Sequence, residues 1–235
     1  LGKPVLVKRS AWGAWNTCCF RVQADRCPQF NRKMPDSPLT HLLQQNRAWS
    51  EAMHSEDPDF FKRLVNQQAP EYLWIGCSDS RVPANEICGL QPGDMFKHRN
   101  IANLVRADDP NCLAVIQFAV NTLKVRHIVV CGHYRCGGVH AAMGSPGEGA
   151  LDGWLSPLRE LRQREADCLS ELEDEEQRWN RLCELNVIEQ VRQLAALPLI
   201  GQAWDEGQRL SLHGWMYQFH TGLLHDLGTS TSGPD

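Results

Sequence analysis

The stretch YLWIGCSDSR, residues 72–81, decides how this chain can fold. It begins as an apolar run of strand length and changes, at its carboxyl end, into soft and charged side chains of the kind that bind metal ions. A second apolar run, residues 127–131, is followed in the same way by GHYRCGG, residues 132–138. Short apolar runs are typical of parallel strands covered on both faces. Because the carboxyl ends of parallel strands meet at one edge of a sheet, we expect the two polar clusters to converge there.

Four side chains in these clusters form a metal-ligand set, and they are Cys77, Asp79, His133 and Cys136. Two thiolates, an imidazole and a carboxylate together suit Zn2+. A structural zinc site is closed by four protein ligands, whereas a catalytic site keeps one position for water. If Asp79 binds the ion, the site is closed; if Arg81 holds that carboxylate in a bidentate pair, the fourth position opens. The spacing of the ligands does not distinguish the closed site from the site with a free fourth position.

Strands and helices alternate along the rest of the chain. The patterns predict further strands at residues 95–99 and 209–217, and a solvated turn or helix end at residues 171–177. Helices are predicted around residues 83–87, from Pro110 to Leu123, through Leu155 to Leu161, and over residues 185–197, ending at Pro198. This alternation predicts an α/β fold with a mainly parallel central sheet flanked by helices.

Two short amphipathic helices are predicted ahead of the first strand. The first starts at Ser37-Pro38, where a cap residue followed by proline favours a helix start, and the second starts at Asp57-Pro58. Their apolar side chains are too few to form a core of their own. We therefore expect an N-terminal helical arm that packs on the main domain or on a partner subunit. The zinc domain as a whole is predicted to span residues 37–228.

The two ends of the chain differ from this domain. Residues 1–36 show no helical or strand period, and residues 1–33 hold seven Lys or Arg against one Asp. We predict a leader outside the domain. An Arg-rich, acid-poor segment is typical of an organellar transit peptide, and an upstream in-frame translation or a cloning remnant are the alternatives. Unless the segment is a genuine transit peptide, we expect a cytoplasmic protein. Residues 229–235 have few hydrophobic side chains and are predicted to fray.

The composition argues against several classes of partner. A chain of 235 residues that is 42% hydrophobic can bury one good core, so one domain is expected. A net charge of -4 and a pI near 6.1 argue against a nucleic-acid partner. No apolar run approaches the roughly 18 residues of a membrane span. Several of the ten cysteines are expected to be free thiols that pack as small hydrophobic side chains, namely Cys88, Cys112, Cys131 and Cys183.

The stretch CSDSR, residues 77–81, together with residues 132–138, resembles the paired signature of the β-class carbonic anhydrases. HRNIAN, residues 98–103, and HGWMY, residues 213–217, match further blocks of that family. The resemblance extends from about residue 38 to about residue 227. It implies reversible hydration of CO2 to bicarbonate and a proton, with one zinc ion per subunit. It also implies homodimers, often paired into homotetramers, in which the first helices wrap the neighbouring subunit.

The resemblance also implies roles for single residues. It makes Asp79 and Arg81 a gating pair, in which Asp79 orients zinc-bound hydroxide toward CO2 in the open state. Backbone groups at Gly137 and Gly138 would help to position the substrate. The permanent zinc ligands that it implies are Cys77, His133 and Cys136.

One subgroup of the family is inhibited by bicarbonate, which a Trp, an Arg and a Tyr hold away from the metal. Trp74, Arg99 and Tyr217 match these three positions. An indole N–H, a guanidinium and a phenol are hydrogen-bond donors that suit a small anion. The alternative interpretation is that Trp74 and Tyr217 are core aromatic side chains.

Two other functions fit the same residues. Relatives on this scaffold hydrolyse other small heterocumulenes such as carbon disulfide, and access to the zinc would distinguish them. The other alternative is a zinc-stabilised module that binds bicarbonate without turning it over. Stopped-flow CO2 hydration by metal-loaded protein separates that possibility from the enzyme.

Overall fold

The structure, a computed structural model, describes residues 38–66 and 68–233. The leader predicted for residues 1–36 lies outside this range. The chain divides into two compact units, Leu1–Glu56 and Asp57–Asp235. None of the helices within the described residues combines the length and hydrophobicity of a membrane span.

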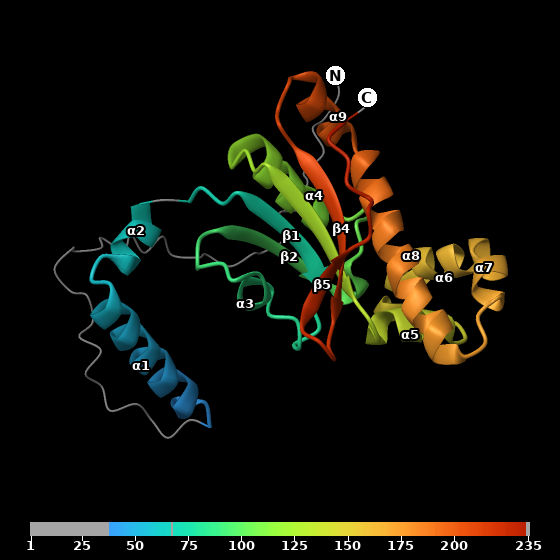
Figure 1. Ribbon diagram of the computed structural model, residues 1–235, viewed down its shortest axis with the longest axis horizontal. Helices are drawn as coiled ribbons and strands as arrows, with labels where there is room; N and C mark the ends of the chain where they lie inside the picture. Colours follow the sequence, from blue (N-terminus) through green and yellow to red (C-terminus); the bar gives the residue numbers. More distant parts are fainter. Residues whose placement is uncertain (1–37, 67, 234–235) are drawn as a thin grey trace, which may run out of the picture. The chain divides into compact units, whose positions relative to one another are not determined.

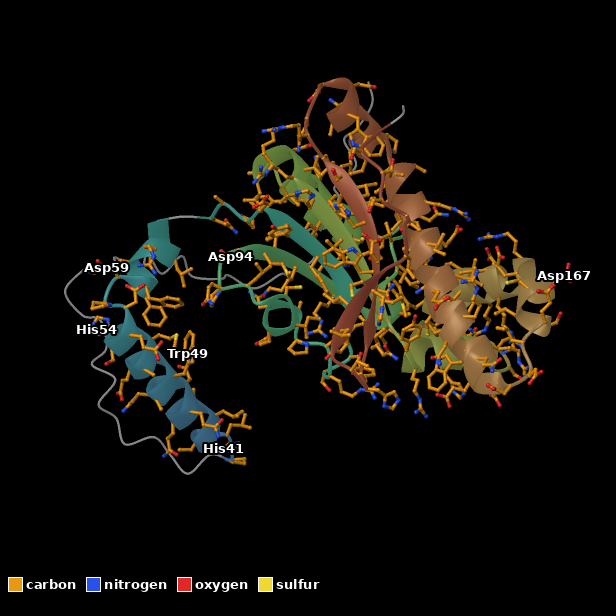
Figure 2. The ribbon with its side chains drawn as sticks, viewed as in Figure 1. His41, Trp49, His54, Asp59, Asp94 and Asp167 are labelled. Carbon is orange, nitrogen blue, oxygen red and sulfur yellow. The ribbon has the colours of Figure 1, made fainter. Side chains whose placement is uncertain are left out.

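The described part of the first unit is the helix α1 (Thr40–Glu56), which the sequence predicts. It has no buried residue: Leu42 and Leu43 are 50% and 53% exposed. Figure 2 shows Trp49, another large side chain of this helix, which is 44% exposed. A helix with so much exposed apolar surface fits the predicted packing of an arm on a partner subunit, which stays a prediction.

The second unit begins with α2 (Phe60–Asn66) and is built on a five-stranded sheet in the order β2-β1-β3-β4-β5 (Figure 1). The first four strands of this order are mutually parallel, and β5 pairs antiparallel with β4. The predicted mainly parallel sheet is therefore confirmed. The strands are β1 (Tyr72–Cys77), β2 (Met95–Asn100), β3 (His127–His133), β4 (Ser211–Gln218) and β5 (Leu223–Asp226).

The two faces of the sheet differ because side chains alternate along each strand. Leu73 and Ile75 of β1 belong to the main hydrophobic core, in which the sheet packs against helices. Trp74 lies between them and points to the opposite face, into a smaller core that includes Val129 and the helix α3 (Ala84–Cys88). The helical segments on the main-core side are α4 (Pro110–Gln117), η2 (Phe118–Thr122), α5 (Gly137–Met143), α6 (Ala150–Arg164), α7 (Ala166–Ser170), α8 (Glu175–Ala195) and α9 (Pro198–Asp205).

The helices near the C-terminal half differ from the prediction at their ends. α8 starts at Glu175, well before the predicted residue 185, because the Asp174 carboxylate caps it by accepting a hydrogen bond from the Gln177 N–H at 2.7 Å. Residues 171–177 therefore lead into a long helix. α8 ends at Ala195, shortly before Pro198, and Pro198 is the first residue of α9. Proline is favoured at the first position of a helix because the N–H that it lacks would have no partner there.

The segment after β4 is more ordered than the sequence predicts. β5 is not predicted at all, and it forms a hairpin with β4 through a turn in which Gly222 adopts φ 70°. Beyond it, Leu212 and Thr231 exchange two backbone hydrogen bonds of 2.8 and 3.1 Å. The Ser230 hydroxyl adds a hydrogen bond to His213 at 3.0 Å. Fraying is therefore wrong as far as Thr231, because backbone and hydroxyl hydrogen bonds replace the missing apolar contacts.

Candidate metal centre

The three soft ligands predicted from the sequence lie together at the carboxyl edge of the sheet. Cys77 is the last residue of β1, His133 is the last residue of β3, and Cys136 is the N-cap of α5. β1 and β3 are parallel neighbours, so their carboxyl ends meet. The ligand atoms of the three side chains lie within 4.8 Å of one another, and all three side chains are buried.

The geometry of this group fits a zinc ion. The Sγ atoms of Cys77 and Cys136 are 3.8 Å apart. Two sulfur ligands at about 2.3 Å from a tetrahedral ion would be separated by about 3.8 Å. His133 Nδ1 donates a hydrogen bond to the Tyr134 carbonyl oxygen, 3.1 Å away. Because Nδ1 carries the proton, the lone pair of the neutral imidazole is on Nε2. That Nε2 atom is buried and has no hydrogen-bond partner among the described residues, as a metal-binding nitrogen would require.

The electrostatics of the thiols favour the same interpretation. The short contact with Cys136 lowers the pKa of Cys77 against the effect of burial. The same contact with Cys77, together with burial, raises the pKa of Cys136. The two side chains therefore share one proton. A divalent cation would stabilise the second thiolate as well, because a bound metal displaces the proton of a coordinating thiol.

The carboxylate of Asp79 is held by Arg81 rather than directed at the three ligands. Arg81 Nε donates to Asp79 Oδ1 at 2.9 Å, and Arg81 Nη2 donates to Oδ2 at 2.7 Å. The backbone N–H of Arg81 also donates to Oδ1, at 2.9 Å. These hydrogen bonds from Arg81 lower the pKa of Asp79 to about 2. Asp79 Oδ2 nevertheless lies only 3.7 Å from His133 Nε2, so the carboxylate is close to the group of candidate ligands.

The two glycines after Cys136 begin α5 and differ in their surroundings. A Cβ atom on Gly138 would lie 2.7 Å from Cγ2 of Ile101, in the short helix η1 (Ile101–Asn103), whereas one on Gly137 would have no neighbour within 4 Å. Gly138 therefore lets α5 approach η1 closely.

The three residues predicted to hold bicarbonate share one face of the sheet. Trp74 is opposite Val129, Arg99 is opposite Gly76, and Tyr217 is opposite His133, which places all three on the side of the smaller core. Trp74 is 1% exposed and Tyr217 is partly buried, so both are also core aromatic side chains.

Arg99 differs from the other two because its side chain is exposed at the edge of the sheet. Its Nε donates to the Cys77 carbonyl oxygen at 2.8 Å, and its Nη2 donates to the Asp79 carbonyl oxygen. Arg99 therefore fixes the backbone of the loop that carries Cys77 and Asp79.

Comparison with known proteins gives one family. A family model described as carbonic anhydrase matches residues 72–224. A carbonic anhydrase of Emericella nidulans is 47% identical to this chain over 192 residues, which are 82% of this chain and 84% of the relative. The chain belongs to the β-carbonic anhydrase family. The match begins at the first residue of β1 and ends inside β5, so it includes all the candidate ligands.

Solved β-carbonic anhydrases have the same fold. One of two tetrameric β-carbonic anhydrases from Sordaria macrospora is 44% identical, with a TM-score of 0.79 over 82% of this chain and 98% of that chain. A Coccomyxa β-carbonic anhydrase in complex with acetazolamide is 39% identical, with a TM-score of 0.81 over 84% of this chain and 89% of that chain. This chain is therefore an enzyme of the carbonic anhydrase class.

Two aromatic residues contact the site of this β-carbonic anhydrase although the sequence reasoning does not identify them. Trp179 of α8 donates from Nε1 to the Cys136 carbonyl oxygen at 2.9 Å. The ring centroid of Phe219 lies 4.2 Å from Cζ of Arg81. The only signal for Phe219 is its place two residues after the HGWMY stretch, and the sequence holds no comparable signal for Trp179.

A second group of ligand-type side chains, His98, Asp109 and Cys112, has its donor atoms within 4.8 Å of one another. The Asn100 amide oxygen accepts a hydrogen bond from the Leu104 N–H at 2.7 Å, so the amide nitrogen faces His98 Nε2, at 3.2 Å. Nε2 then accepts a hydrogen bond, and Nδ1 carries the proton. Neither nitrogen is free to bind an ion, and we assign no metal to this group.

Proposed function

We propose that this chain catalyses the reversible hydration of CO2 to bicarbonate and a proton, with Zn2+ held by Cys77, His133 and Cys136. The observation that carries the proposal is the bidentate pairing of Arg81 with Asp79, described above. A structural zinc site would use the carboxylate as its fourth ligand, whereas this pairing leaves a position for water. With one open position, zinc supplies an acidified water molecule as nucleophile, as it does in carbonic anhydrases generally.

The residues around that position orient the reactants. Because Arg81 keeps the pKa of Asp79 near 2, the carboxylate stays ionised and can only accept hydrogen bonds. In the proposed mechanism Asp79 accepts a hydrogen bond from the nucleophilic water and so directs a lone pair of the water oxygen toward CO2. Backbone N–H groups at Gly137 and Gly138 position the substrate. Asp79 is too weak a base to take up the released proton, which must therefore leave by another route.

The test compares Arg81→Ala with a matched arginine. Arg106 binds Asp108 in the same bidentate way, at 2.9 and 2.8 Å, but away from the metal ligands. We expect Arg81→Ala to lose on the order of 100-fold or more in stopped-flow CO2 hydration, because it frees the gating carboxylate. Its zinc content should remain one ion per chain, and Arg106→Ala should keep its activity.

Three results would contradict this proposal. The first is an Arg81→Ala variant that is as active as the parent protein. The second is a zinc-loaded protein that does not hydrate CO2 at pH 7 or at pH 8.5. The third is a protein that hydrolyses carbon disulfide and does not hydrate CO2. The second result would favour a bicarbonate-binding module without turnover. The third would favour the heterocumulene hydrolase.

We also propose that bicarbonate inhibits the enzyme by binding among Trp74, Arg99 and Tyr217. The shared face of these residues supports this, and so do the hydrogen bonds of Arg99 to the carbonyl oxygens of Cys77 and Asp79. An anion that draws Arg99 away would loosen the loop that carries Asp79. Trp74→Phe should therefore weaken bicarbonate inhibition, and inhibition identical to that of the parent enzyme would remove the regulatory proposal.

We further propose that the chain forms a homodimer or homotetramer. The relatives of Sordaria macrospora are described as tetrameric, and Leu42 and Leu43 of α1 are about half exposed here. Sedimentation velocity should show a dimer or larger species for the parent protein. Leu42→Lys combined with Leu43→Lys should shift it toward the monomer, and a monomeric parent protein would refute the proposal.

A further inference from the structure

Phe219 occupies a position from which one ring contacts three groups of the site. Its centroid is 4.2 Å from Cζ of Arg81, 5.2 Å from the centroid of His133 and 5.4 Å from that of Tyr217. The rings of His133 and Tyr217 meet it at interplanar angles of 61° and 85°, which is edge-on packing. Phe219 therefore links the proposed gating arginine to a proposed metal ligand.

The hairpin between β4 and β5 holds this ring in place. Phe219 directly follows Gln218, the last residue of β4. The Gln218 carbonyl oxygen accepts a hydrogen bond from the Gly222 N–H at 2.9 Å, and the Gln218 side chain accepts one from the Thr221 hydroxyl at 3.3 Å. The turn that carries Phe219 is thus closed by its own hydrogen bonds, which fix the backbone from which the ring projects.

Arg81 depends on such a contact because most of its side chain is in water. The side chain is 57% exposed, one edge of its guanidinium is hydrogen-bonded to Asp79, and the face of the group lies over Phe219. A cation over an aromatic face at an exposed site is stabilised enough to change the equilibrium constant between two side-chain positions about two- to fivefold. Without this contact the long Arg81 side chain would more often leave Asp79, whose Oδ2 atom is already 3.7 Å from His133 Nε2.

We infer that Phe219 is a positioning residue of the active site. Its ring holds Arg81 in the orientation that keeps Asp79 away from the metal position, and so it favours the open state. This inference rests on the proposed function, because it concerns the same gating pair. It assigns Phe219 no contact with substrate, and the effect of a substitution on the gating pair should pass through Arg81.

The test compares two substitutions of this residue. Phe219→Leu keeps an apolar side chain but removes the aromatic face, whereas Phe219→Tyr keeps the face. Phe96→Leu is the matched control, because Phe96 is also partly buried beside another aromatic ring, Phe118, at 5.8 Å. Each zinc-loaded protein is assayed for kcat and KM of CO2 hydration and for zinc content. Azide is then titrated into the Co2+-substituted proteins and followed by visible absorption, because azide needs an open metal position.

We expect Phe219→Leu to lower kcat by a factor of up to about five and to raise the azide midpoint by the same factor. KM and zinc content should not change, and Phe219→Tyr and Phe96→Leu should keep the parent values in both assays. If Phe219→Leu does not fold, Phe219→Met supplies the same comparison. Arg81→Ala is measured alongside these variants.

The outcomes separate this inference from the proposed function. If Phe219→Leu behaves like the parent while Arg81→Ala is inactive, the role of Phe219 is wrong and the gating pair stands. If Phe219→Tyr loses as much as Phe219→Leu, the aromatic face is not what matters and the inference is also wrong. If Arg81→Ala remains active, the gating pair itself is wrong, and the role of Phe219 falls with it.

Discussion

Adjacent glycines at the start of α5 allow one substitution to be tested in two environments. An alanine Cβ at position 138 would lie 2.7 Å from Ile101 Cγ2, 3.2 Å from Ala102 Cβ and 3.4 Å from the Ala102 backbone nitrogen. An alanine Cβ at position 137 would have nothing within 4 Å. Gly138→Ala and Gly137→Ala should therefore change stability in opposite directions.

The magnitudes follow from these contacts. Carbon atoms pack at about 3.5–4.0 Å, so Ile101 and α5 would have to separate by about 1 Å in Gly138→Ala. Ala102 cannot give way easily, because it already has a φ of 63°. Overpacking of this kind costs about 1–3 kcal/mol, and alanine in a helix returns about 0.5–1 kcal/mol. The net loss of unfolding free energy is up to about 2.5 kcal/mol for Gly138→Ala, against a gain of up to about 1 kcal/mol for Gly137→Ala.

Thermal unfolding at fixed zinc and protein concentration measures the difference. For a chain of this size about 1 kcal/mol corresponds to about 2–4 °C in Tm, so the overpacking cost should separate the two variants by about 2–12 °C. The packing argument is refuted if Gly138→Ala melts at or above the parent temperature, or if Gly137→Ala is the less stable variant.

Three further predictions concern other parts of the molecule. Arg135 has a φ of 56°, so Arg135→Gly should be about 1 kcal/mol more stable than Arg135→Ala in urea unfolding, and equal stabilities would refute this. Burial lowers the pKa of both His98 and His213, and the charge of His127 lowers that of His213 further. The unfolded chain therefore binds more protons, and unfolding free energy should fall as pH drops below about 6.5, less steeply in His213→Gln. Removing zinc with a chelator should lower Tm, and added zinc should restore it; a Tm unaffected by the chelator would argue against buried thiolate ligands.

The apolar runs of β1 and β3 could be located from the sequence because strands buried on both faces leave a continuous apolar signal. The convergence of Cys77 with Cys136 could also be predicted from the sequence, because the carboxyl ends of neighbouring parallel strands meet at one edge of the sheet. β5 could not be located in this way. Its residues are mostly exposed, so they carry no apolar pattern, and only pairing with β4 makes them a strand.

The sequence by itself determined the α/β class, the family and the chemical types of the metal ligands, because those depend on patterns and residue identities along the chain. Only the tertiary structure decided that the Asp79 carboxylate pairs with Arg81 instead of joining the candidate metal ligands. It also decided that Arg81 lies over the ring of Phe219. The physical reason is distance: hydrogen bonds and ring contacts change over a few tenths of an ångström. Residues as far apart in the chain as Arg81 and Phe219 are brought to such distances only by the packing of the whole domain.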